Sequence, residues 1–91
     1  MNKKELVAKV AESTGLSQVK ATVALDAVLN SITDAVAAGD KVNLAGFGIF
    51  EKKHREARTG RNPQTREAVE IPASDAPAFK AAKAFKDKVN R

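Results

Sequence analysis

Lysine and arginine side chains are concentrated in the segment from Glu51 to Ala68, EKKHREARTGRNPQTREA, which contains no Val, Leu, Ile, Met or Phe. Because this segment has nothing to bury, it cannot belong to a core and is predicted to project into solvent. Ammonium and guanidinium groups neutralise phosphates, so the chemistry that this segment can do is binding of a polyanion. Its cations are Lys52, Lys53, Arg55, Arg58, Arg61 and Arg66, against the acids Glu51, Glu56 and Glu67.

The centre of the basic segment is Gly60-Arg61-Asn62-Pro63, and Gly and Asn-Pro both favour a turn. We therefore expect a solvated basic hairpin or loop. A charged loop that is disordered when free and folds on binding is an open alternative, and it is compatible with binding to nucleic acid.

Positive charge is unevenly distributed along the chain. Residues 1–40 contain four lysines and five acids, a net charge of −1, whereas residues 41–91 contain twelve Lys or Arg and six acids, a net charge of +6. This asymmetry favours a polyanionic partner, with nucleic acid ahead of a membrane surface. A general contribution of charge to solubility is the alternative.

Other chemistry has little support in the sequence. His54 is the only histidine and cysteine is absent, so no nucleophile–base pair, metal site or cofactor site is expected and the chain is not predicted to be an enzyme. His54 is interpreted as a solvated residue or a phosphate contact. The absence of cysteine suits a reducing compartment. We expect neither a secretory signal nor a membrane span, because MNKKELVAKV is charged and no apolar run approaches the ~18 residues that a span requires.

The N-terminal half predicts two helices joined by a short link. Asn2 and Glu5 form a start resembling a capping box, Gly15 suits a left-handed C-cap, and Ser17 is the expected N-cap of the second helix, which closes at Ala38-Gly39-Asp40. An apolar stripe on the second helix is extended backward by Val19 and Val23. The stripe consists of Leu25, Val28, Leu29, Ile32 and Val36.

The apolar stripe has two interpretations. It could pack against the following sheet in an ordinary core, or both helices could also meet their copies in a second chain. The small core of a lone monomer favours the second interpretation, because oligomerisation is the usual remedy when disulfides and metals are absent.

Strand patterns follow from residue 41. Val42 and Leu44 alternate with polar residues, Gly46-Phe47-Gly48 predicts a tight turn with Phe47 tucked inward, and a strand returns at residues 68–72. Pro72 suits an edge or a bulge. The stretch 80–90 has helix-forming composition, with Lys80, Lys83 and Lys86 on roughly one face.

Taken in order, the motifs MNKKELV, GDKVNLAGFGIF, ARTGRNPQT, EIPAS and PAFKAAKAFKD make the whole chain similar to the HU/IHF family of bacterial histone-like DNA-bending proteins, and within it to HU. The resemblance implies an α+β fold and an intertwined homodimer. Each chain is expected to have an N-terminal helical hairpin, a three-stranded antiparallel sheet with a long protruding β-ribbon arm, and a short C-terminal helix. One HU-like domain, 1–91, is predicted, with a helical dimerisation base (1–40), a sheet (41–79) carrying the basic arm at about 52–70, and a helix at 80–91.

The resemblance also implies the residues that bind DNA. Pro63 matches the proline that the family inserts between base pairs. The predicted contacts are Lys3, Gly46, Lys52, Lys53, Arg55, Arg58, Arg61, Asn62, Pro63, Gln64, Thr65, Arg66, Ser74, Lys80, Lys83 and Lys86. The predicted dimer core is Leu25, Val28, Leu29, Ile32, Val36, Leu44, Phe47, Phe50 and Phe79.

Three departures from the family pattern are visible. Arg66 stands where glycine or asparagine is common, which adds charge and could tighten the turn. Ala81-Ala82 replaces a common Pro-Gly, which could start the last helix earlier. His54 replaces a common Glu or Val-like residue.

The expected function is architectural: cytoplasmic, nucleoid-associated binding of duplex DNA with little sequence specificity, with bending, wrapping and compaction. DNA that is already bent, nicked or kinked should bind better, because part of the deformation is present. A sequence-specific bender of the IHF type and a module that binds acidic proteins are the alternatives.

Overall fold

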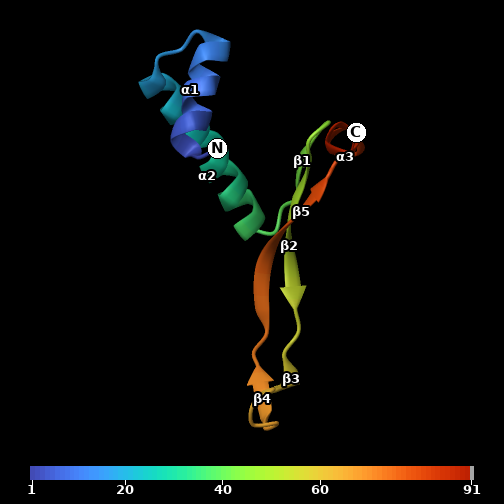
Figure 1. Cartoon of the computed structure of the whole chain (residues 1–91). Helices are drawn as coiled ribbons and strands as arrows, with labels where there is room; N and C mark the ends of the chain where they lie inside the picture. The colour runs from blue at the N-terminus through green and yellow to red at the C-terminus, as the bar shows by residue number, and fades with distance from the viewer. Residues whose placement is uncertain (91) are drawn as a thin grey trace. The chain divides into compact units, whose positions relative to one another are not determined.

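A computed structural model describes residues 1–90 and contains three helices and five strands (Figure 1). The predicted α+β fold is confirmed: a helical hairpin precedes a three-stranded antiparallel sheet, a two-stranded ribbon and a short C-terminal helix. Two compact units, Met1–Asp34 and Ala35–Arg91, divide the chain. In chain order the elements are α1 (Lys3–Thr14), α2 (Gln18–Ala37), β1 (Val42–Leu44), β2 (Gly48–Arg55), β3 (Arg58–Arg61), β4 (Ala68–Ile71), β5 (Ser74–Ala81) and α3 (Lys83–Val89).

Local signals set the ends of α1. The side chain of Asn2 accepts a hydrogen bond from the Glu5 amide at 2.9 Å, which satisfies one of the unpaired N–H groups at the helix start. Gly15 ends the helix with φ +76°, and its N–H donates to the carbonyl of Ala11 at 2.9 Å. The predicted caps of this helix are confirmed.

The ends of α2 follow the same logic. Ser17 Oγ accepts from the Lys20 amide at 3.1 Å, as the N-cap assignment predicts. At the other end, Asp40 N–H donates to Ala35 at 2.9 Å and Gly39 N–H donates to Val36 at 3.0 Å. This pair of bonds is a Schellman motif, and it requires the left-handed conformation that Gly39 adopts at φ +94°.

A small cluster of Val7, Ala11 and Ala21 joins α1 to α2 within the first unit. Ala21 is fully buried, whereas Val19 and Val23 are 75% and 65% exposed. Residues two positions from Ala21 lie about 200° around the helix, on its far side. The expectation that Val19 and Val23 extend the apolar stripe is therefore wrong.

The second unit contains the sheet β1-β2-β5, in which every pairing is antiparallel. Leu44 pairs with Gly48 across the first hairpin, and Phe47 N–H donates to Leu44 O at 2.9 Å within that turn. Gly46 supplies the left-handed residue of the turn, with φ +78°. Along the other edge, β2 pairs with β5 from Gly48↔Ala81 to Arg55↔Ser74.

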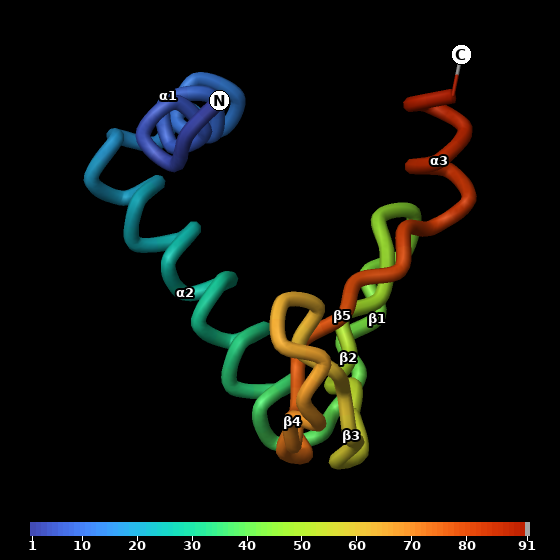
Figure 2. Tube along the Cα trace, turned by 60° about the horizontal axis from the view of Figure 1, so that its bottom comes forward, coloured from blue at the N-terminus to red at the C-terminus, as the bar shows by residue number. Residues whose placement is uncertain are grey.

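Strands β3 and β4 continue the β2–β5 ribbon away from α3, to the tip that Figure 2 brings forward. Arg55 pairs with Ser74 and Arg58 pairs with Ile71, so two residues on each strand separate the ladders and the register is unchanged. Pro72 lies in this break, where it cannot donate a ladder hydrogen bond. The arm is thus one ribbon with an interruption, and its base belongs to the three-stranded sheet.

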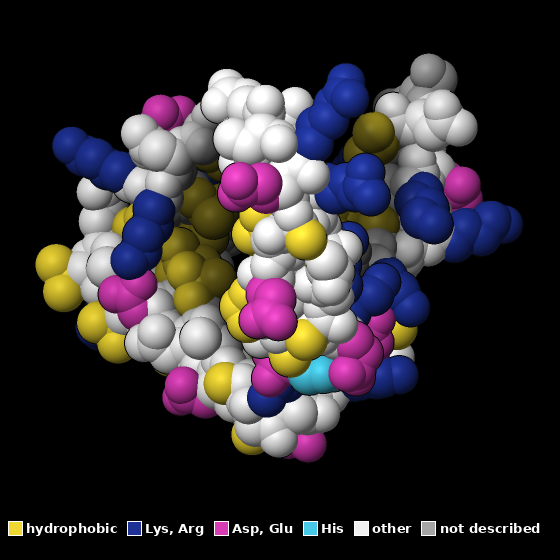
Figure 3. Space-filling view, turned by 90° about the horizontal axis from the view of Figure 1, so that it is seen from below, with side chains coloured by type: hydrophobic (Ala, Val, Ile, Leu, Met, Phe, Trp, Pro, Cys, Tyr) yellow, Lys and Arg dark blue, Asp and Glu magenta, His cyan; other side chains and the backbone are white. Residues whose placement is uncertain are grey.

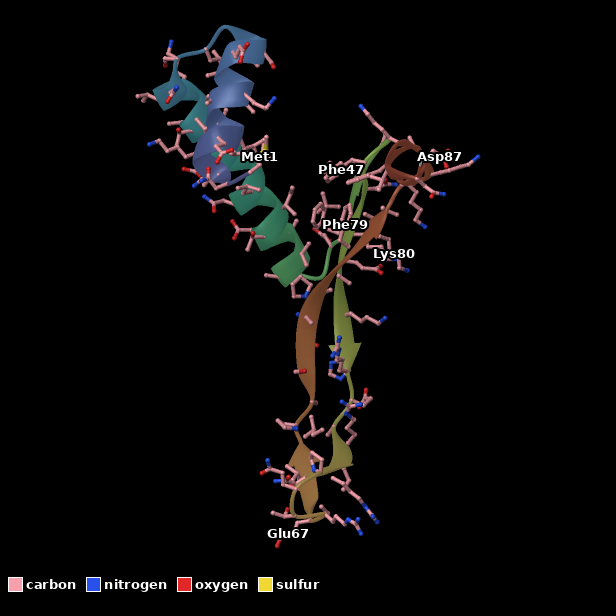
Figure 4. All side chains as sticks on the ribbon, viewed as in Figure 1. Met1, Phe47, Glu67, Phe79, Lys80 and Asp87 are labelled. Atoms are coloured by element: carbon pink, nitrogen blue, oxygen red, sulfur yellow. The ribbon has the colours of Figure 1, made fainter. Side chains whose placement is uncertain are left out.

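Phe47, Phe50, Phe79 and Phe85 form an aromatic cluster, with ring centroids 4.7 Å apart for Phe50 and Phe79 and 5.2 Å apart for Phe47 and Phe85. Figure 4 shows Phe47 and Phe79 on the part of the sheet next to α3. Phe47 is nevertheless 45% exposed, and Phe79 is 42% exposed. The inward position predicted for Phe47 is only partly realised in a single chain.

Helix α3 begins at Lys83, later than the sequence suggested. Lys80 and Ala81 remain in β5, paired with Ile49 and Gly48, and Ala82 N–H donates to Phe47 O at 2.9 Å. These backbone bonds compete with helix formation, so Ala81-Ala82 does not start the helix earlier. Across residues 1–90, no helix has the length and apolar character needed to cross a membrane.

Candidate nucleic-acid interface

Asn62 organises the loop at the arm tip. Its N–H donates to Glu67 O at 3.0 Å, and its carbonyl accepts from Arg66 N–H at 2.7 Å. Its side-chain oxygen accepts from the Gln64 amide at 2.9 Å, which is an Asx-turn around Pro63. Asn62 is half-buried and Pro63 is exposed, so an internally bonded loop presents a rigid apolar ring to solvent.

Arg66 is the only non-glycine residue with positive φ among residues 1–90, at +60°. A side chain in the left-handed region is sterically strained, which explains why glycine or asparagine suits this position. The loop closes around Arg66 through the bond to Asn62, so the strain is held by the tip's own hydrogen bonds. Arg66 therefore adds a positive charge to the tip and strains the backbone there.

The base of the arm has two chemically different faces. Side chains alternate along a strand, so Lys53 and Arg55 share one face of β2 and Lys52 and His54 share the other. Ser74 pairs with Arg55, which places a predicted body contact beside a predicted arm contact. The face with Lys53 and Arg55 has cations without ion-pair partners among residues 1–90.

The ammonium group of Lys52 contacts two other residues of the chain. It lies 3.6 Å from Asp75 Oδ2 and donates to the carbonyl of Ala37, at the end of α2, at 3.3 Å. A cation is favoured at a helix C-terminus, where carbonyl groups lack partners. The geometry thus gives Lys52 a positioning role between the end of α2 and the base of the arm.

His54 lies between two carboxylates. Its Nδ1 is 2.7 Å from Asp75 Oδ1, and its Nε2 is 3.2 Å from Glu56 Oε1. Figure 3 shows the histidine bordered by acidic side chains. The hydrogen bond with His54, helped by the charge of Lys52, holds the pKa of Asp75 below its ordinary value of 3.8.

Glu51 holds two lysines at the body end of β2. Its carboxylate oxygens lie 3.2 Å from Lys80 Nζ and 3.6 Å from Lys41 Nζ, and its side chain is only 17% exposed. The hydrogen bond and positive charge of Lys80, followed by Lys41, lower the pKa of this carboxyl from 4.5. Lys80 is therefore partly neutralised before any ligand arrives, and Figure 4 shows it beside the aromatic part of the sheet.

The other predicted contacts are spread over several elements. Lys3, on α1 in the first unit, forms an ion pair with Asp26 at 2.5 Å. Gly46 occupies the β1–β2 turn, and Gln64 and Thr65 lie in the tip loop. The predicted cations without an ion pair among the described residues are Lys53, Arg55, Arg58, Arg61, Arg66, Lys83 and Lys86.

Within residues 1–90, no three acidic, histidine or cysteine side chains cluster as a metal site would require.

Sequence reasoning did not identify Asp75, Glu56 and Glu51 as partners of predicted contact residues. The signal that could have found Asp75 is the arm register, which places it directly opposite His54. Asp26, the partner of Lys3, is 23 positions away on a different helix, and no local pattern predicts such a pair.

A long ribbon with unpaired cations along it and an exposed tip defines a class of protein that contacts an extended polyanion. Residues 1–90 match the family model described as bacterial DNA-binding protein, and the chain belongs to this family, which includes HU. DNA-binding protein HU of Geobacillus stearothermophilus is 62% identical over 89 residues, which is 98% of this chain and 99% of the relative. HU of Clostridium pasteurianum is 50% identical over 91 residues, the full length of both chains.

Solved structures agree with this assignment. An Anabaena HU–DNA cocrystal structure superimposes with a TM-score of 0.90 at 53% identity, covering 98% of this chain and 97% of that one. HU from Thermotoga maritima gives a TM-score of 0.69 at 36% identity, covering 98% of each chain. The resemblance to the HU/IHF family inferred from the sequence is confirmed.

Proposed function

We propose that this protein is an architectural DNA-binding protein that binds duplex DNA with little sequence specificity and bends, wraps and compacts it. The observation that carries the proposal is the projecting ribbon, whose tip exposes Pro63 and whose cations other than Lys52 form no ion pair within residues 1–90. The relatives are named DNA-binding proteins, and the Anabaena protein was crystallised with DNA.

Affinity is proposed to come from phosphate contacts. Lysine and arginine release counterions when they neutralise phosphates, which gives binding that does not depend on sequence and weakens steeply with salt. Among the predicted contacts, those without internal partners should contribute most. Lys3, Lys52 and Lys80 should contribute less, because each is already paired with a carboxylate.

Bending is proposed to come from the tip. The minor groove is about 6 Å wide in relaxed DNA and must open to admit a two-stranded ribbon. Architectural proteins such as IHF and HU open the minor groove with apolar wedges that unstack base steps. Pro63 suits the role, because it is apolar, rigid and exposed.

A homodimer is proposed as the functional unit. Among residues 1–90 of the single chain, the buried hydrophobic residues are only Val7, Ala11, Ala21 and Val36. Several larger apolar side chains of the predicted dimer core stay exposed: Val28 53%, Leu29 44%, Leu44 36%, Phe47 45% and Phe79 42%. A second copy that covers them would supply the burial that a chain of this size needs.

In this proposal the chain is one functional domain, with residues 1–40 as the dimerisation base, 41–79 as the sheet and arm, and 80–91 as the C-terminal segment. We propose that it acts in the bacterial nucleoid, in the cytoplasm; the DNA-binding names of its relatives support this location.

The test is a gel-shift comparison of intact, nicked and four-way-junction DNA at several salt concentrations. Binding should fall steeply with salt and should be tighter for the nicked and junction DNA, because less bending energy remains to be supplied. A footprint confined to one motif in random DNA would instead identify a sequence-specific bender. Failure to bind any DNA at ~50 mM salt, combined with binding to acidic proteins, would overturn the proposal.

A further inference from the structure

We propose that protonation of His54, which is held between Asp75 and Glu56, neutralises the negative charge at the base of the arm, so that DNA affinity increases as the pH falls. This inference rests on the proposed function, because it concerns the strength of that binding. His54 lies on the face of β2 that carries Lys52, which is opposite the face that carries Lys53 and Arg55.

The hydrogen-bonding capacity of the ring is the first argument. A neutral imidazole has one N–H and can donate to only one partner, whereas the imidazolium has two. Both ring nitrogens of His54 face a carboxylate oxygen, Asp75 at 2.7 Å and Glu56 at 3.2 Å. Only the protonated ring donates to both.

The local charge is the second argument. The charged groups facing His54 on its own side of the ribbon are Asp75 on β5, Glu56 after β2, and Lys52, which contacts Asp75 at 3.6 Å. With a neutral ring these three groups carry a net charge of −1, which repels DNA. Protonation brings the cluster to neutrality. Both N–H groups of the ring then donate to Asp75 and Glu56, so DNA is affected through the charge of this surface, where the His54 side chain is 54% exposed.

The sign of the pH dependence follows from linkage. Phosphates brought near the ring favour its charged form, so the complex binds more protons than the free protein and its dissociation constant falls as protons are added. One linked proton per arm can change affinity by at most about tenfold per pH unit. His54 is the only histidine in the chain, so proton uptake that is lost in His54→Gln can be assigned to this ring.

The direct experiment is calorimetric titration of the intact protein with a nicked duplex at about pH 6.5, in two buffers of different ionisation enthalpy. The wild-type protein should take up protons on binding, and His54→Gln should take up measurably fewer. Dissociation constants at fixed salt should improve about threefold to tenfold from pH 7.5 to 5.5 for the wild type, and by less for His54→Gln.

Two further variants separate charge from structure. His54→Lys keeps a positive charge at every pH tested, so its affinity should be insensitive to pH and close to that of the wild type at low pH. Asp75→Asn removes one carboxylate, so its binding at high pH should be tighter than that of the wild type. Melting curves of each variant at both pH values confirm that folded protein is compared.

The outcomes are distinct from those of the proposed function. Salt-dependent binding with equal proton uptake by wild type and His54→Gln overturns the role of His54 and leaves the proposed function standing. Proton release on binding by the wild type, absent in His54→Gln, overturns the predicted sign. If none of the folded proteins binds DNA at low salt, the proposed function fails, and this inference fails with it.

Discussion

The Cβ atom that Gly48 lacks would lie 2.5 Å from Cε1 of Phe79 and 2.6 Å from the carbonyl oxygen of Lys80. Both separations are far shorter than the roughly 3.5–4.0 Å at which carbon atoms make their most favourable dispersion contacts. Strand β2 can therefore lie against the aromatic cluster only because residue 48 has no side chain. The glycine in the Gly46-Phe47-Gly48 turn that decides packing is the second one, whereas Gly46 is needed for its φ of +78°.

Gly48→Ala should destabilise the sheet, because the carbonyl of Lys80 belongs to the paired backbone and cannot move independently. Overpacking of this kind typically costs about 1–3 kcal/mol, and urea unfolding would measure it. Gly60→Ala is the matched control, since the only atom closer than 3 Å to its new Cβ is the flexible end of Ile71, at 2.9 Å, and the nearest backbone atom is 4.0 Å away. Equal unfolding free energies for the two variants would contradict the packing argument.

Protonation of the Glu51 carboxylate should lower the free energy of unfolding in acid. Its pKa is lowered in the folded chain by Lys80 and Lys41, so its contribution is present above the ordinary value of 4.5 and is lost as the pH falls through the folded value. Glu51→Gln should reduce stability at neutral pH and flatten the acid limb of the stability profile. Urea unfolding between about pH 7 and 3 would test this, with Glu70→Gln, an exposed carboxylate without an ion pair in residues 1–90, as control.

Arg66 should be replaceable with a gain in local order at the tip. Arg66→Gly removes the penalty of the left-handed backbone, of about 1–2 kcal/mol, and Arg66→Gln removes the charge but keeps the penalty. Hydrogen exchange of the Asn62 amide, which donates to Glu67, should therefore slow in the glycine variant and not in the glutamine variant. Both variants should bind DNA with a weaker salt dependence, because each arm loses one cation.

The features predicted from sequence are those set by neighbouring residues. Asn2 and Ser17 cap helices through side chains that reach three residues ahead, and Gly15 and Gly39 end them through their own backbone. The apolar pattern did not predict that Val19 lies on the outer face of α2. The pattern records which residues are apolar, whereas the face depends on the angle of each residue around the helix axis. The link from Lys52 to Ala37 and Asp75 depends on strand register and on a helix end, which no short motif specifies.

The start of α3 illustrates the same limit. Lys80 to Asn90 has helix-forming composition, yet Lys80 and Ala81 pair with β2 because the arm register extends to Gly48↔Ala81. Tertiary hydrogen bonds override an intrinsic propensity of a few tenths of a kcal/mol per residue. The late helix start is thus a consequence of the hairpin and not of residues 81 and 82 themselves.

The proposed dimer predicts that the melting temperature rises with protein concentration, because folding and association are then one equilibrium. Leu29→Lys should lower both stability and oligomer size, since Leu29 lies on the apolar stripe and is 44% exposed in the single chain. Val23→Lys, on the far side of α2 and 65% exposed, should change neither. Melting that is independent of concentration over about a hundredfold range would exclude an obligate dimer.

Pro63 should control bending separately from affinity. Pro63→Ala removes the rigid ring at the tip but no charge, so its salt-dependent binding should stay close to that of the wild type. The bend should decrease, because a smaller and more mobile side chain unstacks a base step less effectively. A duplex labelled at both ends would report this as lower energy transfer at saturating protein.

Val69→Ala is the control for the bending experiment, since it shortens an exposed apolar side chain of the arm that is not among the predicted DNA contacts and keeps Pro63. Its energy transfer should match that of the wild type. Energy transfer that is unchanged in Pro63→Ala would show that the wedge is not at the tip proline. Bending would then have to arise from the phosphate contacts along the ribbon, and Arg61→Ala, which weakens those contacts, would reduce the bend where Pro63→Ala did not.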